Sequence, residues 1–90
     1  MKPVDTLKTA AGLVGGDRAQ QYGDYNVLHQ RVADLWSAYL TVEVKPEQAA
    51  FCMALLKVAR NEMGQVKPDN GVDASAYVAL WAAMMEDKNA

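Results

Sequence analysis

The segment over residues 46–59 constrains the fold more than any other part of the sequence. Pro46 suits the first position of a helix and Glu47 its positive end, and the apolar residues that follow point to every side of that helix. They are Ala49, Ala50, Phe51, Cys52, Met53, Ala54, Leu55, Leu56, Val58 and Ala59. A helix that is apolar all round needs neighbours on every side. We therefore expect a central helix that the rest of the chain surrounds and that Gly64 and Pro68 end.

Three further helices are predicted from apolar residues at helical spacing. The first covers residues 3–14. The second covers residues 25–41 and is the clearest amphipathic helix, so we expect its apolar stripe to face the core. That stripe consists of Leu28, Val32, Leu35, Trp36 and Tyr39. The fourth helix begins after Asp73, and residues 17–24 are expected to form a tight elbow with Asp24 as the N-cap of the second helix.

Chain length, charge and cysteine content narrow the class of protein. The ninety residues are predicted to form one all-α domain over residues 1–90, a compact four-helix bundle or array. A chain this short buries only about 60–65% of the surface that its unfolded form exposes, so we expect a homo-oligomer. Its net charge of −2 gives no general attraction to nucleic acid or anionic lipid, and we expect neither a nucleic acid nor a membrane as partner. Cys52 stands alone in an apolar run, which predicts a buried, unreactive thiol in a reducing cytoplasm.

Lys57 and Arg60 form the first candidate site, together with Asp73 and Tyr77. The two cations lie on neighbouring positions of the most apolar helix, and Asp73 and Tyr77 lie four residues apart on the inward stripe of the next. One interpretation is structural: a semi-buried ion-pair cluster that fixes the third helix to the fourth. The other is a ligand site, in which Lys57 and Arg60 neutralise phosphates while Asp69 and Asp73 hold Mg²⁺.

A second polar cluster lies at the elbow and contains Arg18, Tyr22 and Asp24. An arginine beside an aromatic ring can hold the phosphate and the base of a nucleotide, whereas the structural alternative is helix capping beside a surface arginine. His29, at the edge of the apolar stripe, could contact a ligand or act in proton transfer, or could be a core-edge histidine satisfied by a partner. Trp36 could stack a base, or could simply pack in the core.

The order of the motifs resembles a family of small phage and prophage proteins of unassigned function. The matching stretches are Arg18 with Tyr22-Gly23-Asp24, Leu35-Trp36-Ser37-Ala38-Tyr39-Leu40, Leu56-Lys57-Val58-Ala59-Arg60, and Asp69-Asn70-Gly71-Val72-Asp73 with Tyr77. This resemblance implies a phage or prophage and the cytoplasm of a bacterial host cell. A more distant similarity is to all-α nucleotide pyrophosphohydrolases of the MazG type and phage nucleotide-modification domains, where helix-borne acids hold Mg²⁺. The first acidic motif of that superfamily has no counterpart here, because the second helix carries Gln30, Arg31 and Asp34 instead.

Three functions remain open from the sequence. The leading hypothesis is a protein that binds, and sequesters, a nucleotide or another phosphate-bearing small molecule between the elbow and the Lys57, Arg60 and Asp73 cluster. The second is a Mg²⁺-dependent nucleoside triphosphate pyrophosphohydrolase with Asp24, Asp69 and Asp73 as metal ligands. The third is a non-catalytic structural or interaction protein. No residue is assigned a catalytic role.

Overall fold

The computed structural model describes residues 1–17, 24–64 and 66–88. Within these residues the chain forms four α-helices and no strand, so the predicted all-α class is confirmed. The elements are α1 (Pro3–Gly12), which continues into a π-helical turn η1 (Leu13–Asp17), then α3 (Tyr25–Leu40), α4 (Pro46–Met63) and α5 (Pro68–Lys88). None of the helices in the described part of the chain is long and apolar enough to cross a bilayer.

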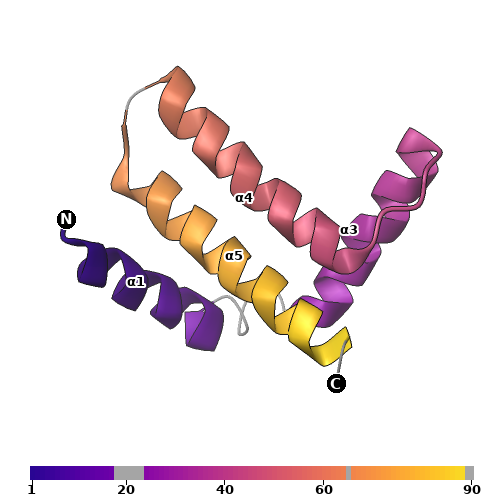
Figure 1. The fold of residues 1–90 in the computed structure, drawn as a ribbon, viewed down its shortest axis with the longest axis horizontal. Coiled ribbons are helices and arrows are strands. Elements are labelled where there is room, and N and C mark those ends of the chain that lie inside the picture. Colours follow the sequence, from indigo (N-terminus) through magenta and orange to yellow (C-terminus); the bar gives the residue numbers. More distant parts are fainter. Residues whose placement is uncertain (18–23, 65, 89–90) are drawn as a thin grey trace.

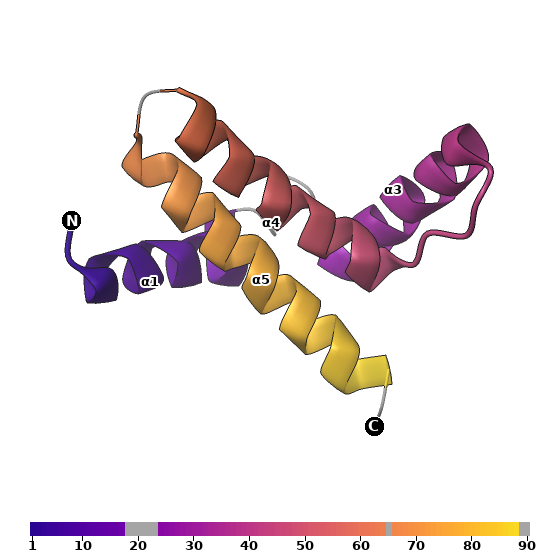
Figure 2. The ribbon, with the colours of Figure 1, turned by 45° about the horizontal axis from the view of Figure 1, so that its top comes forward.

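The α4 and α5 helices run antiparallel, side by side, and make the most extensive contact in the molecule (Figure 1). The α1 helix lies along α5 on the side away from α4. The α3 helix crosses the N-terminal end of α4 and then projects away from the pair (Figure 2). The arrangement is therefore an open array in which only α4 and α5 are paired over most of their length.

Local sequence signals account for the helix starts. Asp24 accepts a hydrogen bond from the backbone N–H of Asn26 at 2.7 Å, which confirms it as the N-cap of α3. The prediction that the last helix follows Asp73 is wrong, because α5 already begins at Pro68. Proline both ends a preceding helix and suits the first position of the next, and here it does the latter. Asp69 and Asp73 thus lie on α5, one turn apart, and not in a loop.

Three polar contacts align α4 with α5. In order along α4, they join Glu47 to Lys88, Lys57 to Asp73, and Asn61 to Asn70. Successive partners advance along α4 and recede along α5, as an antiparallel pair requires. Between the first two contacts, Ala50 and Ala54 lie on the same stripe of α4 and are buried. Their small side chains let the two helices approach closely.

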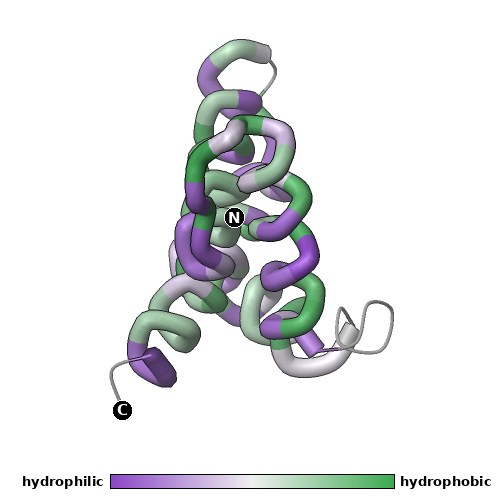
Figure 3. The backbone as a smooth tube through the Cα atoms, turned by 90° about the vertical axis from the view of Figure 1, so that its right-hand side faces the viewer, coloured by the Kyte–Doolittle hydropathy of each residue, from purple (hydrophilic) through white to green (hydrophobic). Residues whose placement is uncertain are grey.

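The buried core of the described residues consists mostly of alanine. Its apolar members are Ala10, Ala33, Ala49, Ala50, Ala54, Val72, Ala76 and Met84. The prediction that the third helix is surrounded is therefore wrong: α3 and α5 cover part of α4, and Phe51, Leu55 and Cys52 are exposed. The buried thiol predicted for Cys52 is wrong for the same reason. Hydrophobic and hydrophilic positions are interspersed along the helices (Figure 3).

The apolar stripe of α3 does not face the core as predicted. Leu35 and Tyr39 are 70% and 87% exposed, whereas His29 and Ala33 are buried. The cause is the direction of α3, whose C-terminal half extends beyond α4 (Figure 2). A neighbouring stripe, one that contains His29 and Ala33, makes the contact with the rest of the chain.

The Glu47–Lys88 pair joins the start of α4 to the end of α5, with a distance of 3.0 Å between Glu47 Oε1 and Lys88 Nζ. Burial raises the pKa of Glu47, but hydrogen bonds from its backbone N–H and from Lys88, with the charges of Lys88 and Lys45, outweigh burial and bring that pKa below its ordinary value. The hydrogen bond to Glu47 and the charge of that carboxylate raise the pKa of Lys88. Each charge also lies at the helix end that favours it.

The depressed pKa of Glu47 predicts an acid-dependent loss of stability. The contribution of Glu47 to the free energy of unfolding is fully present above the pKa of an unfolded glutamate, about 4.3. It is lost as the pH falls through the lower pKa of the folded state. In urea unfolding at a series of pH values, the free energy of unfolding of wild type should exceed that of Glu47→Gln at neutral pH, and this difference should shrink towards pH 3. The exposed Glu86 supplies the control Glu86→Gln, which should run parallel to wild type. A Glu47→Gln difference that does not change with pH would contradict this assignment.

The alanine contact predicts that a larger side chain at Ala50 destabilises the fold. Ala50→Leu should lower the free energy of unfolding by about 1–3 kcal/mol, because α4 cannot move outward without straining the flanking polar contacts. Ala59→Leu, at an exposed position of the same helix, is the matched control and should change stability by no more than about 0.5 kcal/mol. Equal effects at both positions in thermal or urea unfolding would show that the alanines do not set the helix spacing.

Candidate functional site

Of the two interpretations of this group of residues, the ion pair between the third and fourth predicted helices is present for Lys57 and Asp73, and the ligand site stays a prediction. Lys57 Nζ lies 3.1 Å from Asp73 Oδ2, and both side chains are 17% exposed. Lys57 comes from the C-terminal half of α4 and Asp73 from the second turn of α5. A half-buried ammonium needs a charged or hydrogen-bonded partner, and the carboxylate supplies one.

His29 and Tyr77 extend this pair towards α3. His29 is buried, with 3% of its surface exposed, and its ring meets the Tyr77 ring edge-on with centroids 6.2 Å apart. Nδ1 of His29 donates to the backbone carbonyl of Tyr25 at 2.8 Å, so in the neutral ring Nε2 is the nitrogen that carries the lone pair. Tyr77 lies one turn after Asp73 on α5. We call His29, Lys57, Asp73 and Tyr77 the junction cluster, because they bring together α3, α4 and α5.

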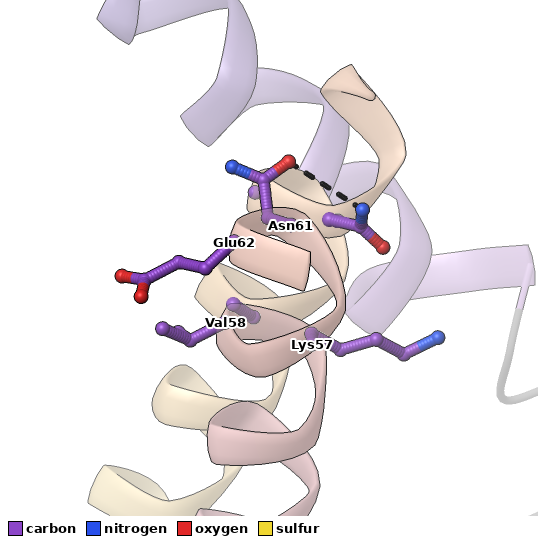
Figure 4. A pocket seen from close by; sticks show the side chains of 7 residues that line it. Lys57, Val58, Asn61 and Glu62 are labelled. Carbon is purple, nitrogen blue, oxygen red and sulfur yellow. Dashed lines mark hydrogen bonds between the residues drawn. The ribbon is translucent and has the colours of Figure 1, made fainter. Parts of the chain in front are cut away.

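A small pocket of about 120 Å³ lies beside Lys57, between α4 and α5 (Figure 4). Its lining residues are Lys57, Val58, Asn61 and Glu62 from α4, and Asn70, Gly71 and Ala74 from α5. Asn61 Oδ1 accepts hydrogen bonds from the Asn70 side chain and, at 3.2 Å, from the backbone N–H of Lys67. The pocket is below the roughly 300–1,000 Å³ typical of sites for drug-sized ligands. It is too small for a whole nucleotide, and the Glu62 carboxylate in its lining is unfavourable to an anionic group.

The other predicted site residues do not all join the junction cluster. Arg60 was expected to face inward beside Lys57, and this is wrong: it is exposed, because neither α3 nor α5 covers that side of α4 at this point. Trp36 is half-buried on α3, and Asp24 is exposed as the cap of that helix. Arg18 and Tyr22 lie outside the described residues. The elbow as a whole, and its part in a ligand site, stays a prediction.

The predicted Mg²⁺ ligands lie on one face of α5. Asp73 is paired with Lys57, and Asp69, one turn earlier, is exposed. Among residues 1–17, 24–64 and 66–88, no group of three or more His, Cys, Asp or Glu side chains is close enough to hold a metal ion together. Two carboxylates with water and ligand phosphates are a usual set for Mg²⁺. Mg²⁺ at this position stays a prediction.

Sequence reasoning did not find the amides of Asn61 and Asn70. The Asp-Asn-Gly sequence predicted a turn at Asn70. In the structure Asn70 is a buried residue in the first turn of α5. The signal that was available is the position of Asn61 one turn after Lys57, which puts both on the stripe of α4 that faces α5. A polar residue on the same stripe of a helix as a lysine and two alanines indicates a hydrogen-bond partner on the next helix.

Comparison with known proteins relates this all-α chain to a phage protein. It belongs to the family described as "Domain of unknown function (DUF6378)", whose model matches residues 5–85. Among curated relatives it is similar to the "Gene 55 protein" of Mycobacterium phage L5, with 42% identity over 79 residues. The match covers 87% of this chain and 51% of that protein, so the chain spans about half the length of its curated relative. No solved structure matches.

These findings confirm the resemblance to phage proteins and assign no activity. The distant similarity to MazG-type pyrophosphohydrolases stays a hypothesis. What the site offers chemically is therefore judged from its own residues: one cation held by a carboxylate, a buried imidazole, a phenol ring and a small pocket lined by two amides and the Glu62 carboxylate.

The Lys57–Asp73 contact predicts an energetic coupling that a double-mutant cycle measures. With Lys57→Met and Asp73→Leu, the two single changes should together cost about 1 kcal/mol more than the double variant, a value between those of exposed and buried pairs. The cycle isolates this pair from other contacts that Asp73 makes. The control cycle uses Lys67→Met, at an exposed lysine near the start of α5, with Asp73→Leu. Coupling in the control and none at Lys57 would contradict the assigned pairing.

Proposed function

We propose that this member of the phage family binds a phosphate-bearing small molecule, such as a nucleotide, at the junction cluster, and that it acts by holding this ligand. One observation carries the proposal: four residues that the sequence suggests as ligand contacts come from three helices to one place. Two of them, Lys57 and Asp73, keep part of their side chains accessible. A polar cluster at a meeting point of helices is a common position for small-molecule sites.

The chemistry of the cluster suggests how such a ligand is held. The Lys57 ammonium, held beside Asp73, suits a phosphate group, since a charge-assisted hydrogen bond is stronger than a neutral one. The Asp73 carboxylate suits hydroxyl donors of a sugar. The Tyr77 ring is an aromatic surface against which a base could lie. Because Lys57 and Asp73 together carry no net charge, we expect a ligand with one or two phosphates to bind better than a metal-free triphosphate.

Calorimetric titration with nucleoside mono-, di- and triphosphates tests the proposal. At least one of them should bind with a dissociation constant below the millimolar range. Lys57→Ala should weaken that binding at least about tenfold, the effect of losing one charge-assisted hydrogen bond. Lys8→Ala, at an exposed lysine of α1, is the control and should bind as wild type does. Binding by none of the nucleotides at millimolar concentration would sink the proposal and favour a purely structural role for the ion pair.

Incubation with the same nucleotides distinguishes binding of the ligand from its hydrolysis. A Mg²⁺-dependent pyrophosphohydrolase would release pyrophosphate from a nucleoside triphosphate in the presence of Mg²⁺, and Asp69→Asn would abolish that release. The proposal predicts an unchanged ligand, recovered after prolonged incubation with and without Mg²⁺. Pyrophosphate release that requires Asp69 and Asp73 would contradict the proposal and show that the protein is a pyrophosphohydrolase.

A further inference from the structure

The chain exposes more surface than a compact monomer of its mass. Its accessible surface is 6359 Å², whereas a folded monomer of 9.8 kDa is expected to expose about 5,200 Å². The excess is about 1,200 Å². The radius of gyration of 13.6 Å also exceeds the value of about 12 Å expected for a compact chain of this length. The open arrangement of helices therefore leaves a large area uncovered.

Much of the uncovered area is apolar. Large hydrophobic residues are usually the core of a domain, but in the described part of this chain no large side chain is fully buried and alanines fill the core. In a domain that is stable alone, large apolar side chains are buried; here many of them are exposed and small ones are buried. Large apolar patches of this kind on a protein surface mark sites of association.

One patch is continuous across α4 and α5. Phe51, Leu55 and Val58 follow one another at helical spacing on one side of α4, and Val78 and Trp81 do so on α5. The rings of Phe51 and Trp81 lie 5.3 Å apart and join the two helices at one end. At the other end, Val58 lines a pocket together with Ala74, one turn before Val78. We call these five residues the α4–α5 apolar face.

The α4–α5 apolar face is hollowed where the two rings meet. A groove of about 380 Å³ is lined there by Val44, Gln48, Phe51, Cys52 and Trp81. A cavity of this size accepts one or two large side chains. Leu55, 52% exposed, stands beside it on the next turn of α4 and is a side chain that a partner can cover.

We propose that a second copy of this chain covers the α4–α5 apolar face in a two-fold symmetric dimer. Near a two-fold axis each residue meets its own counterpart, so a charge there would be opposed by the same charge. The five residues of the face carry no charge, and neither do Gln48 and Cys52 at the groove. The excess of about 1,200 Å² over the whole chain is large enough to include the roughly 800 Å² that one subunit buries in a standard interface.

Sedimentation velocity on the full chain and three variants tests this dimer. Wild type at high micromolar concentration should sediment as a dimer. Leu55→Glu places a carboxylate in the face and should sediment as a monomer, while Leu35→Glu, which makes the same change at the exposed stripe of α3, should remain a dimer. Val78→Glu tests the face from α5 and decides the matter if Leu55→Glu loses its helical circular dichroism.

Each alternative result counts against the dimer as described. A monomeric wild type overturns it, and a wild type larger than a dimer overturns the two-copy contact. Leu55→Glu or Val78→Glu that folds and stays dimeric moves the interface elsewhere, and a monomeric Leu35→Glu does the same. None of these outcomes depends on ligand binding at the junction cluster, because Leu55 and Val78 do not belong to it.

Discussion

The close approach of α4 and α5 is the constraint on which the rest of the structure depends. Small side chains at Ala50 and Ala54 permit it, and polar contacts on either side of them fix the alignment of the two helices. Alanine buries little hydrocarbon, so this contact by itself supplies less hydrophobic stabilisation than a core of leucine or phenylalanine would. The polar contacts therefore matter for specificity, since they set one register where an alanine seam would tolerate several.

The candidate site is a consequence of that register. The alignment that brings Glu47 to Lys88 at one end of the antiparallel pair also brings Lys57 to Asp73. The α3 helix then adds His29 against Tyr77, one turn further along α5. The small pocket beside Lys57 also borders the α4–α5 apolar face, because Val58 belongs to both. The two proposals thus concern adjacent surfaces of one helix pair and can be tested separately.

The sequence predicts the helices well because proline, glycine and capping residues act locally. The N-cap role of Asp24 follows from its position before the second helix. Spacing also placed Lys57 within reach of Asp73, as one of two interpretations. Prediction from the sequence fails where one residue is compatible with two structures. Pro68 starts a helix where a loop was expected. Pairings between helices that lack charge, such as Asn61 with Asn70, give almost no sequence signal.

The largest failure concerns which apolar faces are covered. Periodicity shows that α3 has an apolar stripe and that α4 is apolar all round, but not whether the cover comes from the same chain. Leu35, Tyr39 and Cys52 were expected inside and are outside. A hydrophobic pattern is satisfied equally by an intramolecular core and by an interface, since burial in either removes the same surface from water. The homo-oligomer expected from chain length remains a proposal, now with a defined face.

Small-angle X-ray scattering from the wild-type protein tests most directly whether the uncovered apolar surface belongs to an interface. Forward scattering should give the mass of two copies of the 9.8-kDa chain, with a radius of gyration of about 16 Å or more, the value for a compact assembly of twice this length. A mass of one copy, together with a radius of gyration near the 13.6 Å of the single chain, would contradict the account.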